Sequence, residues 1–272
     1  MGKPVKLFIV EGENRDFRFI ERMTKQFFSR GKFESKIINV PAAQNIYMLY
    51  NTLVKDNFET DLIEVLRDSV DTAREKLEGI RRQDVDEIFL FFDYDVHQNN
   101  LGHNNSSDDV LKQMLDFFQD ETDNGKLYIS YPMVEALYDY RDAECEPYSS
   151  CFIGFDEICN YKRLSGEENS KASSSIEIDD WQMILKIFVL RIKCMLEVEN
   201  LDFDVYRSKV TPSSIYSVQK TYKNRVFVLS AFPEFLFDYF PVKFWKSHAS
   251  LKNFKFHFCA KNRKPKYYNN KI

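Results

Sequence analysis

A run of five residues in which every side chain is apolar constrains the fold more than any other feature. The run is Ile88–Phe92, and Asp93 and Asp95 follow it. A strand that is apolar at every position is typical of a parallel sheet whose two faces are both covered. A second apolar run, Val5–Val10, ends in Glu11. The sequence therefore predicts a buried parallel sheet in which two strands end in acids.

Helical and extended patterns alternate along the first half of the chain. Apolar runs predict strands at Val5–Val10, Lys36–Val40, Ile88–Phe92 and Lys126–Ser130. Apolar residues at helical spacing predict helices at Asn14–Phe28, Ala42–Val54 and Phe58–Ile80. A further helix is expected to begin at a cap, Ser107 or Asp108, and to end at about Phe118. The last helix of this half is expected to begin at Pro132 and to continue over Val134–Tyr140. This alternation predicts an α/β fold, a parallel four-stranded sheet flanked by helices, with ligand sites at the carboxyl ends of its strands.

The second half of the chain has a different pattern. Residues Asp179–Val198, with Asp179 or Asp180 as the cap, and Ser230–Pro241 predict helices, and the serine-rich stretch Arg163–Ser175 predicts a linker. We therefore expect a catalytic domain at 1–148, with a helical insert at about 42–82, and a mostly helical region at 149–272.

Composition limits the class of protein. None of the apolar runs approaches the ~20 residues that span a bilayer, so we expect no membrane contact. The chain has 272 residues and five cysteines, an odd number with no CxxC pair. This cysteine usage favours a reduced, cytoplasmic protein. The net charge of −4 excludes a protein that is basic throughout.

Basic residues are concentrated at the end of the chain. Residues 239–272 contain nine Lys or Arg side chains, no acid, and several interleaved aromatic side chains. Such a segment can hold a phosphate backbone and stack bases, and its candidate contacts are Lys261, Arg263, Lys264 and Lys266. The alternatives are a basic surface over buried aromatic residues and a docking tail for an acidic partner.

The acids at the strand ends predict a metal site. Carboxylates gathered at one sheet edge raise each other's pKa unless a cation lies among them, and oxygen ligands favour Mg²⁺ or Mn²⁺. The main candidates are Glu11, Asp93 and Asp95, because residues two apart on a strand point to the same side. Weaker candidates are Asp16 and Glu135 as ligands, His97 and Lys126 as catalytic helpers, and Gly12 as the turn that admits phosphate. The simpler interpretation is that these acids begin helices or form turns.

Two motifs carry a family resemblance over residues 5–140. "IVEGEN" followed by "FLFFDYD" resembles the TOPRIM domain, which has Glu-Gly after its first strand and Asp-x-Asp after its third. The resemblance implies that Glu11 is a metal ligand or general acid/base and that Asp93 and Asp95 bind Mg²⁺. It also implies hydrolysis of phosphodiester bonds in DNA or RNA, tRNA included.

The later motifs "SYPMVEALYDY" and "SAFPEFLFDYF" are similar in style to stand-alone, OLD-like TOPRIM proteins. Those proteins are paired with an ABC-type ATPase in bacterial anti-phage systems. The resemblance implies a toxic effector of abortive infection with an ATPase partner, and it is compatible with a homodimer.

The chain departs from the nuclease pattern at one position. Many such sequences carry an acid four residues after the Glu, where this chain has Arg15, and Asp16 comes one residue later. The number of metals therefore stays open.

Two other functions remain open. The stretch "FLFFDYDVH" also resembles the first motif of haloacid-dehalogenase phosphatases, in which Asp93 would be the nucleophile and Asp95 the general acid. That hypothesis leaves Glu11 without a role. The third possibility is a TOPRIM-like fold that binds a partner without catalysis.

Overall fold

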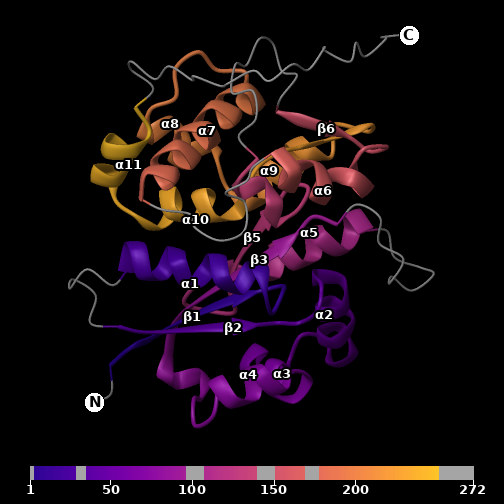
Figure 1. Ribbon diagram of the computed structural model, residues 1–272. Coiled ribbons are helices and arrows are strands. Elements are labelled where there is room, and N and C mark those ends of the chain that lie inside the picture. The colour runs from indigo at the N-terminus through magenta and orange to yellow at the C-terminus, as the bar shows by residue number, and fades with distance from the viewer. Residues whose placement is uncertain (1–2, 29–34, 96–106, 140–150, 169–177, 251–272) are drawn as a thin grey trace.

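A five-stranded sheet forms the centre of this computed structural model, which describes residues 3–28, 35–95, 107–139, 151–168 and 178–250 (Figure 1). The strand order is β2-β1-β3-β5-β4. The strands are β1 Val5–Val10, β2 Lys36–Pro41, β3 Val85–Asp93, β4 Gln119–Asp120 and β5 Gly125–Ser130. Strands β1, β2, β3 and β5 run parallel, as predicted. The short edge strand β4 pairs antiparallel with β5 and was not predicted from the sequence.

The register of the central strands places their ends side by side. Every residue of β1 is buried, as are residues Ile88–Phe92 of β3, which confirms the prediction of a covered parallel strand. Val10 pairs with Phe91, and Asp93 pairs with Ser130. The residues that follow β1 and β3 therefore meet at one edge of the sheet.

One face of the sheet is covered by helices from opposite ends of the chain. Figure 1 shows α1 (Arg15–Phe28) and α10 (Ala231–Tyr239) along the same side of the sheet. Phe235 of α10 is fully buried and packs at ring distances of 4.8–6.1 Å, and its partners are Phe8, Phe28, Phe89, Phe91, Tyr128 and Tyr239. This aromatic cluster therefore contains residues from both the expected domain 1–148 and the expected helical region 149–272.

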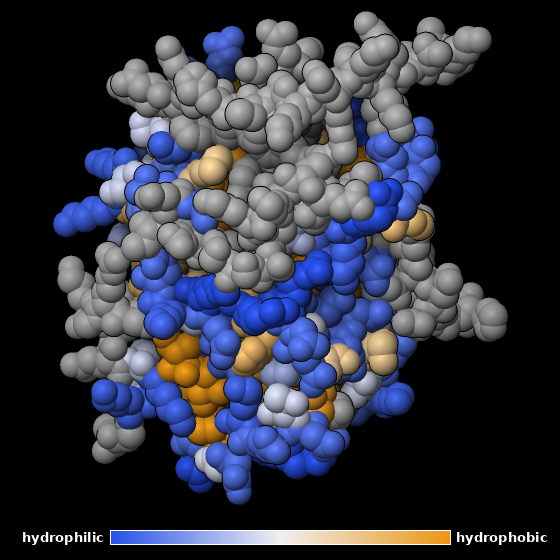
Figure 2. Space-filling model, viewed as in Figure 1, coloured by the Kyte–Doolittle hydropathy of each residue, from blue (hydrophilic) through white to orange (hydrophobic). Residues whose placement is uncertain are grey.

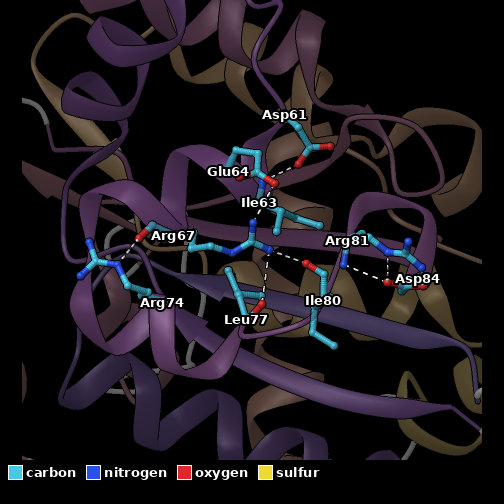
Figure 3. Close-up of polar contacts among 9 residues, drawn as sticks. All are labelled: Asp61, Ile63, Glu64, Arg67, Arg74, Leu77, Ile80, Arg81 and Asp84. Atoms are coloured by element: carbon cyan, nitrogen blue, oxygen red, sulfur yellow. Dashed lines mark hydrogen bonds and ion pairs between the residues drawn. The ribbon is translucent and has the colours of Figure 1, made fainter.

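The insert after β2 is helical but does not contain the single long helix expected at 58–80. It forms α2 (Ile46–Leu53), α3 (Leu62–Ser69) and α4 (Asp71–Lys76), and the chain turns at Val70, where φ is −137°. Arg67 donates hydrogen bonds to the carbonyl oxygens of Leu77 and Ile80, and Arg74 donates to that of Arg67 at 3.1 Å (Figure 3). Arg74 thus satisfies the Arg67 carbonyl, which a continuous helix would have bonded internally, and Arg67 satisfies two carbonyls after the end of α4.

The segment after β5 also differs from the prediction. The helix expected at 134–140 is a single 3₁₀ turn, η3, over Val134–Leu137, and Pro132 precedes it after a cis peptide bond. The backbone of Tyr131 instead exchanges two hydrogen bonds with Leu229, at 2.7 and 2.8 Å. A segment from the last third of the chain therefore lies against the carboxyl end of β5.

The remaining elements are mostly helices, as expected. They are α5 Ser107–Phe117, α6 Ile158–Glu168, α7 Ile178–Leu196, α8 Phe203–Lys209, α9 Pro212–Gln219 and α11 Val242–His248, with two strands, β6 Phe152–Gly154 and β7 Arg225–Phe227. The antiparallel β6–β7 pair was not predicted. Residues 163–168 belong to α6, so the linker prediction is wrong there, and 169–175 lie outside the described residues. Asp179 and Asp180 lie inside α7, so neither is its cap.

Outside the grey atoms, the surface seen in Figure 2 is mostly hydrophilic, and its largest apolar patch lies in the lower part of the molecule. Among the helices of the described ranges, none combines the length and apolar character needed to cross a membrane.

The aromatic cluster predicts the effect of one substitution on stability. Phe235→Ala should lower the free energy of unfolding by about 3–5 kcal/mol, because it opens a cavity between α10 and the sheet. Val242→Ala, at a side chain that is 37% exposed, should change it by no more than about 0.5 kcal/mol. Urea unfolding followed by circular dichroism measures both. A loss below ~1 kcal/mol for Phe235→Ala would show that α10 does not support the sheet.

Candidate functional site

Glu11 and Asp93 meet at the carboxyl edge of the sheet. Asp93 is the last residue of β3, and Glu11 follows the neighbouring strand β1 directly. The Asp93 N–H donates to Glu11 Oε2 at 3.1 Å, and the Glu11 N–H donates to the carbonyl oxygen of Phe91 at 3.1 Å. The pairing of the two strands therefore fixes the positions of both acids, as the sequence predicted.

Asp16 joins this pair from the first turn of α1. Its Oδ2 accepts a hydrogen bond from the Gly12 N–H at 2.8 Å. A Cβ atom at residue 12 would lie 2.7 Å from that oxygen, so glycine leaves room for the Asp16 carboxylate. The displacement of the acid from position 15 to position 16 does not remove a carboxylate from this edge. Close approach of a phosphate at Gly12 stays a prediction.

Asp95 lies near the other acids, but not for the predicted reason. The strand ends at Asp93, and Asp95 has a left-handed backbone with φ of 43°, so strand alternation does not orient it. The turn is fixed at Tyr94 instead. Its N–H donates to the carbonyl oxygen of Ser130 at 2.9 Å, and its own carbonyl oxygen accepts from the Tyr47 hydroxyl at 3.1 Å.

The surroundings of these acids disfavour their charged forms. Burial raises the pKa of Glu11 to about 8; the Asp93 N–H bond opposes this rise, and the charges of Asp16 and Asp95 add to it. Burial also raises the pKa of Asp93 well above its usual value, and the charges of Glu11 and Asp16 act in the same direction. The pKa of Asp16 is raised by burial, against the opposing effects of the Gly12 N–H bond, Arg15 and Lys162. Three neighbouring carboxyl groups of this kind, on Glu11, Asp16 and Asp93, hold protons or attract a cation.

The carboxylate oxygens of this cluster are suitable ligands for a hard cation, but the side chains as they are placed do not form a coordination shell. Carboxylate oxygens are the ligands that Mg²⁺ and Mn²⁺ prefer. Within the described ranges, however, no group of three or more His, Cys, Asp or Glu side chains has the geometry to hold a metal ion. Glu11 Oε2 and Asp16 Oδ2 each accept a backbone N–H bond, and the second oxygen of each carboxylate could serve as a ligand.

Glu135 is bound to cations of the protein itself. It is buried in η3, forms an ion pair with Arg15 Nη1, and lies 4.0 Å from Lys162 Nζ. Arg15 also donates to the Tyr138 hydroxyl at 3.2 Å. This pairing favours a structural role for Glu135 over the metal-ligand role expected from the sequence. It also explains the arginine in the place of the usual acid, because Arg15 ties the start of α1 to η3.

Lys126 is not a helper at this edge. It pairs with Phe89 near the start of β5, four residues before Ser130 and about 13 Å away along the strand. Its ammonium group instead forms an ion pair with Asp238 of α10. The expected helper His97 and the expected substrate contacts lie outside the described residues; those contacts are Lys261, Arg263, Lys264 and Lys266.

The raised pKa of Glu11 predicts a pH dependence of stability. A carboxyl group whose pKa rises from 4.5 in its ordinary state to about 8 on folding stabilises the fold at low pH. That stabilisation is lost as pH rises through the interval between the two values, at about 1.4 kcal/mol per pH unit. We compare the fall in the free energy of unfolding between pH 5 and 7.5, without divalent metal. This fall should be larger in wild type than in Glu11→Gln, by on the order of 3 kcal/mol.

Urea unfolding at a series of pH values in EDTA measures this difference. Asp86→Asn, which neutralises an exposed acid at the opposite end of β3, should keep the wild-type slope. Equal slopes for wild type and Glu11→Gln would contradict the assigned burial of Glu11.

Comparisons of the chain with protein-family models, with curated proteins and with solved structures found no match. The resemblance to the TOPRIM domain therefore rests on the two motifs, and the arrangement of the acids is described by the structure independently of it.

Proposed function

We propose that the protein is a Mg²⁺- or Mn²⁺-dependent nuclease of the TOPRIM type. The observation that carries this proposal is the meeting of Glu11, Asp16, Asp93 and Asp95 at the carboxyl edge of two adjacent parallel strands. Ligand sites of open α/β sheets lie at that edge. The phosphatase alternative uses only the two aspartates and gives neither Glu11 nor Asp16 a role, so the nuclease accounts for more of the cluster.

The four acids would hold the metal, which when bound activates water and stabilises charge on phosphate. Without metal, a carboxyl group with a pKa near 8 keeps a proton at neutral pH, and metal binding would displace that proton from Glu11. Asp93 fixes the Glu11 carboxylate through its N–H group, and Gly12 fixes that of Asp16. The Arg15–Glu135 ion pair positions the first turn of α1, from which Asp16 projects.

The resemblance also supports a biological context. We propose that the nuclease is the toxic effector of an anti-phage, abortive-infection system and is held by an ABC-type ATPase. Co-purification of the tagged chain from its native host, followed by mass spectrometry, tests for that ATPase.

Cleavage assays test the nuclease directly. With Mn²⁺ and labelled tRNA, plasmid and single-stranded DNA, wild type should cleave at least one substrate. Glu11→Gln and Asp93→Asn should each slow cleavage by at least about 100-fold, because each removes a charged carboxylate from the proposed site. Asp86→Asn, on the same strand but at its other end, should cleave at the wild-type rate. Unchanged cleavage by Glu11→Gln would refute this site.

Metal titration separates the nuclease from a non-catalytic binding protein. Calorimetry at pH 8 should detect Mn²⁺ binding to wild type, and binding should weaken at least tenfold at pH 6, because protons then occupy the buried carboxyl groups. Asp93→Asn should abolish the heat signal while Asp86→Asn preserves it. Absence of binding at millimolar Mn²⁺ would favour the non-catalytic alternative.

A further inference from the structure

A basic segment outside the expected tail lies beside the carboxylate edge. Residues 205–233 contain five Lys or Arg side chains and no acid, in a chain whose net charge is −4. Three of these cations follow α9 closely, and Lys220, Lys223 and Arg225 are all exposed. A local positive surface on an acidic protein attracts a polyanion to one place.

Two tyrosine rings place the segment beside the turn that carries Asp93 and Asp95. Helix α9 contacts both α5 and β5 and lies in the same part of the molecule as α5 in Figure 1. The ammonium group of Lys220 lies 5.7 Å from the centre of the Tyr216 ring. The Tyr216 ring lies 6.4 Å from that of Tyr94, which stands between Asp93 and Asp95 in the chain.

Arg225 is held in place at the start of β7. Its guanidinium carbon lies 4.0 Å from the centre of the Phe152 ring and 4.7 Å from that of Tyr222. The fully buried Gln219 fixes the backbone by donating to the Arg225 carbonyl oxygen at 3.1 Å and accepting from the Phe227 N–H at 2.9 Å. Within the part of the chain that the structure describes, neither Arg225 nor Lys223 forms an ion pair with a carboxylate. A stacked guanidinium keeps its in-plane N–H groups for oxygen ligands such as phosphate.

We propose that a single strand of nucleic acid binds across Lys220, Lys223 and Arg225 and is led from there to the carboxylate cluster. This inference rests on the proposed nuclease function and assigns its substrate-binding surface. Leu229 bonds to Tyr131, one residue past the end of β5, and Arg225 lies four residues earlier, about 13 Å along an extended chain, so this surface lies close to the carboxyl end of β5.

A partly exposed aromatic ring beside these cations favours a single strand over a duplex. Tyr222 is half-buried next to Lys223, and its ring supports the Arg225 guanidinium. Aromatic side chains that alternate with cations are typical of proteins that stack unpaired bases while holding their phosphates. A duplex offers no unpaired base faces to such rings.

Fluorescence anisotropy in EDTA measures binding without cleavage. The probes are fluorescein-labelled 20-nucleotide oligo(U) and oligo(dT), titrated with full-length protein at several salt concentrations. Lys220→Ala/Lys223→Ala should weaken binding of at least one probe about tenfold at 0.15 M salt. It should also make the slope of log affinity against log salt shallower by about 1.4, which is two lost phosphate contacts at ~0.7 each. Both lysines are exposed, so thermal unfolding should be unchanged.

Matched variants make the result decisive. Lys25→Ala/Lys36→Ala removes two exposed lysines from the last turn of α1 and the start of β2, far from the carboxyl edge, and should bind as wild type does. Equal binding by both double variants, or no binding by wild type, overturns the proposed surface.

The two proposals fail in different ways. If binding requires Lys220 and Lys223 but no substrate is cleaved with Mn²⁺, the surface stands and the nuclease is refuted. If Glu11 is needed for cleavage while Lys220→Ala/Lys223→Ala binds and cleaves as wild type does, the nuclease stands and this surface is refuted.

Discussion

The hydrogen bond from the Asp93 N–H to the Glu11 carboxylate joins the ends of the two central strands, and the candidate site depends on it. It links the end of β3 to the residue after β1, so the backbone pairing that builds the sheet also sets the distance between two acids. Asp16 is then brought in by the Gly12 N–H, through a turn of only a few residues. The site is therefore a product of strand register and of one short turn, rather than of a preformed cage of side chains.

Holding acids together at a buried edge costs stability, and the sheet around them offsets that cost. Each unit by which folding raises a carboxyl pKa corresponds to about 1.4 kcal/mol against the charged form. The opposing contribution comes from burial of aromatic rings, and Phe8, Phe91 and Phe235 pack together within 6.4 Å of one another. A cation at the edge would relieve the repulsion, which links metal affinity, pH and stability in one equilibrium.

The sequence allowed prediction of features that depend on local pattern. The apolar runs identified β1 and β3, and the acids that end them lie together as expected. Features that depend on distant partners were not predictable. Arg15 looked like a defect in a motif until its partner Glu135, 120 residues away, was placed beside it. Lys126 looked like a possible helper until the structure paired it with Asp238. At the break at Val70, the carbonyl oxygen of Arg67 is bonded by the side chain of Arg74, which the sequence pattern does not reveal.

The contribution of α10 to the sheet has a consequence for how the chain matures on the ribosome. Helix α10 spans residues 231–239, and Phe235 covers rings from β1, β3 and β5, which are made much earlier. Leu229, which bonds to the residue after β5, is also made late. A nascent chain that has exposed only its first 220 residues therefore has an uncovered sheet and an unsupported carboxyl edge. In a nuclease of the kind proposed, this order delays assembly of the active edge until residues 229–239 have left the ribosome.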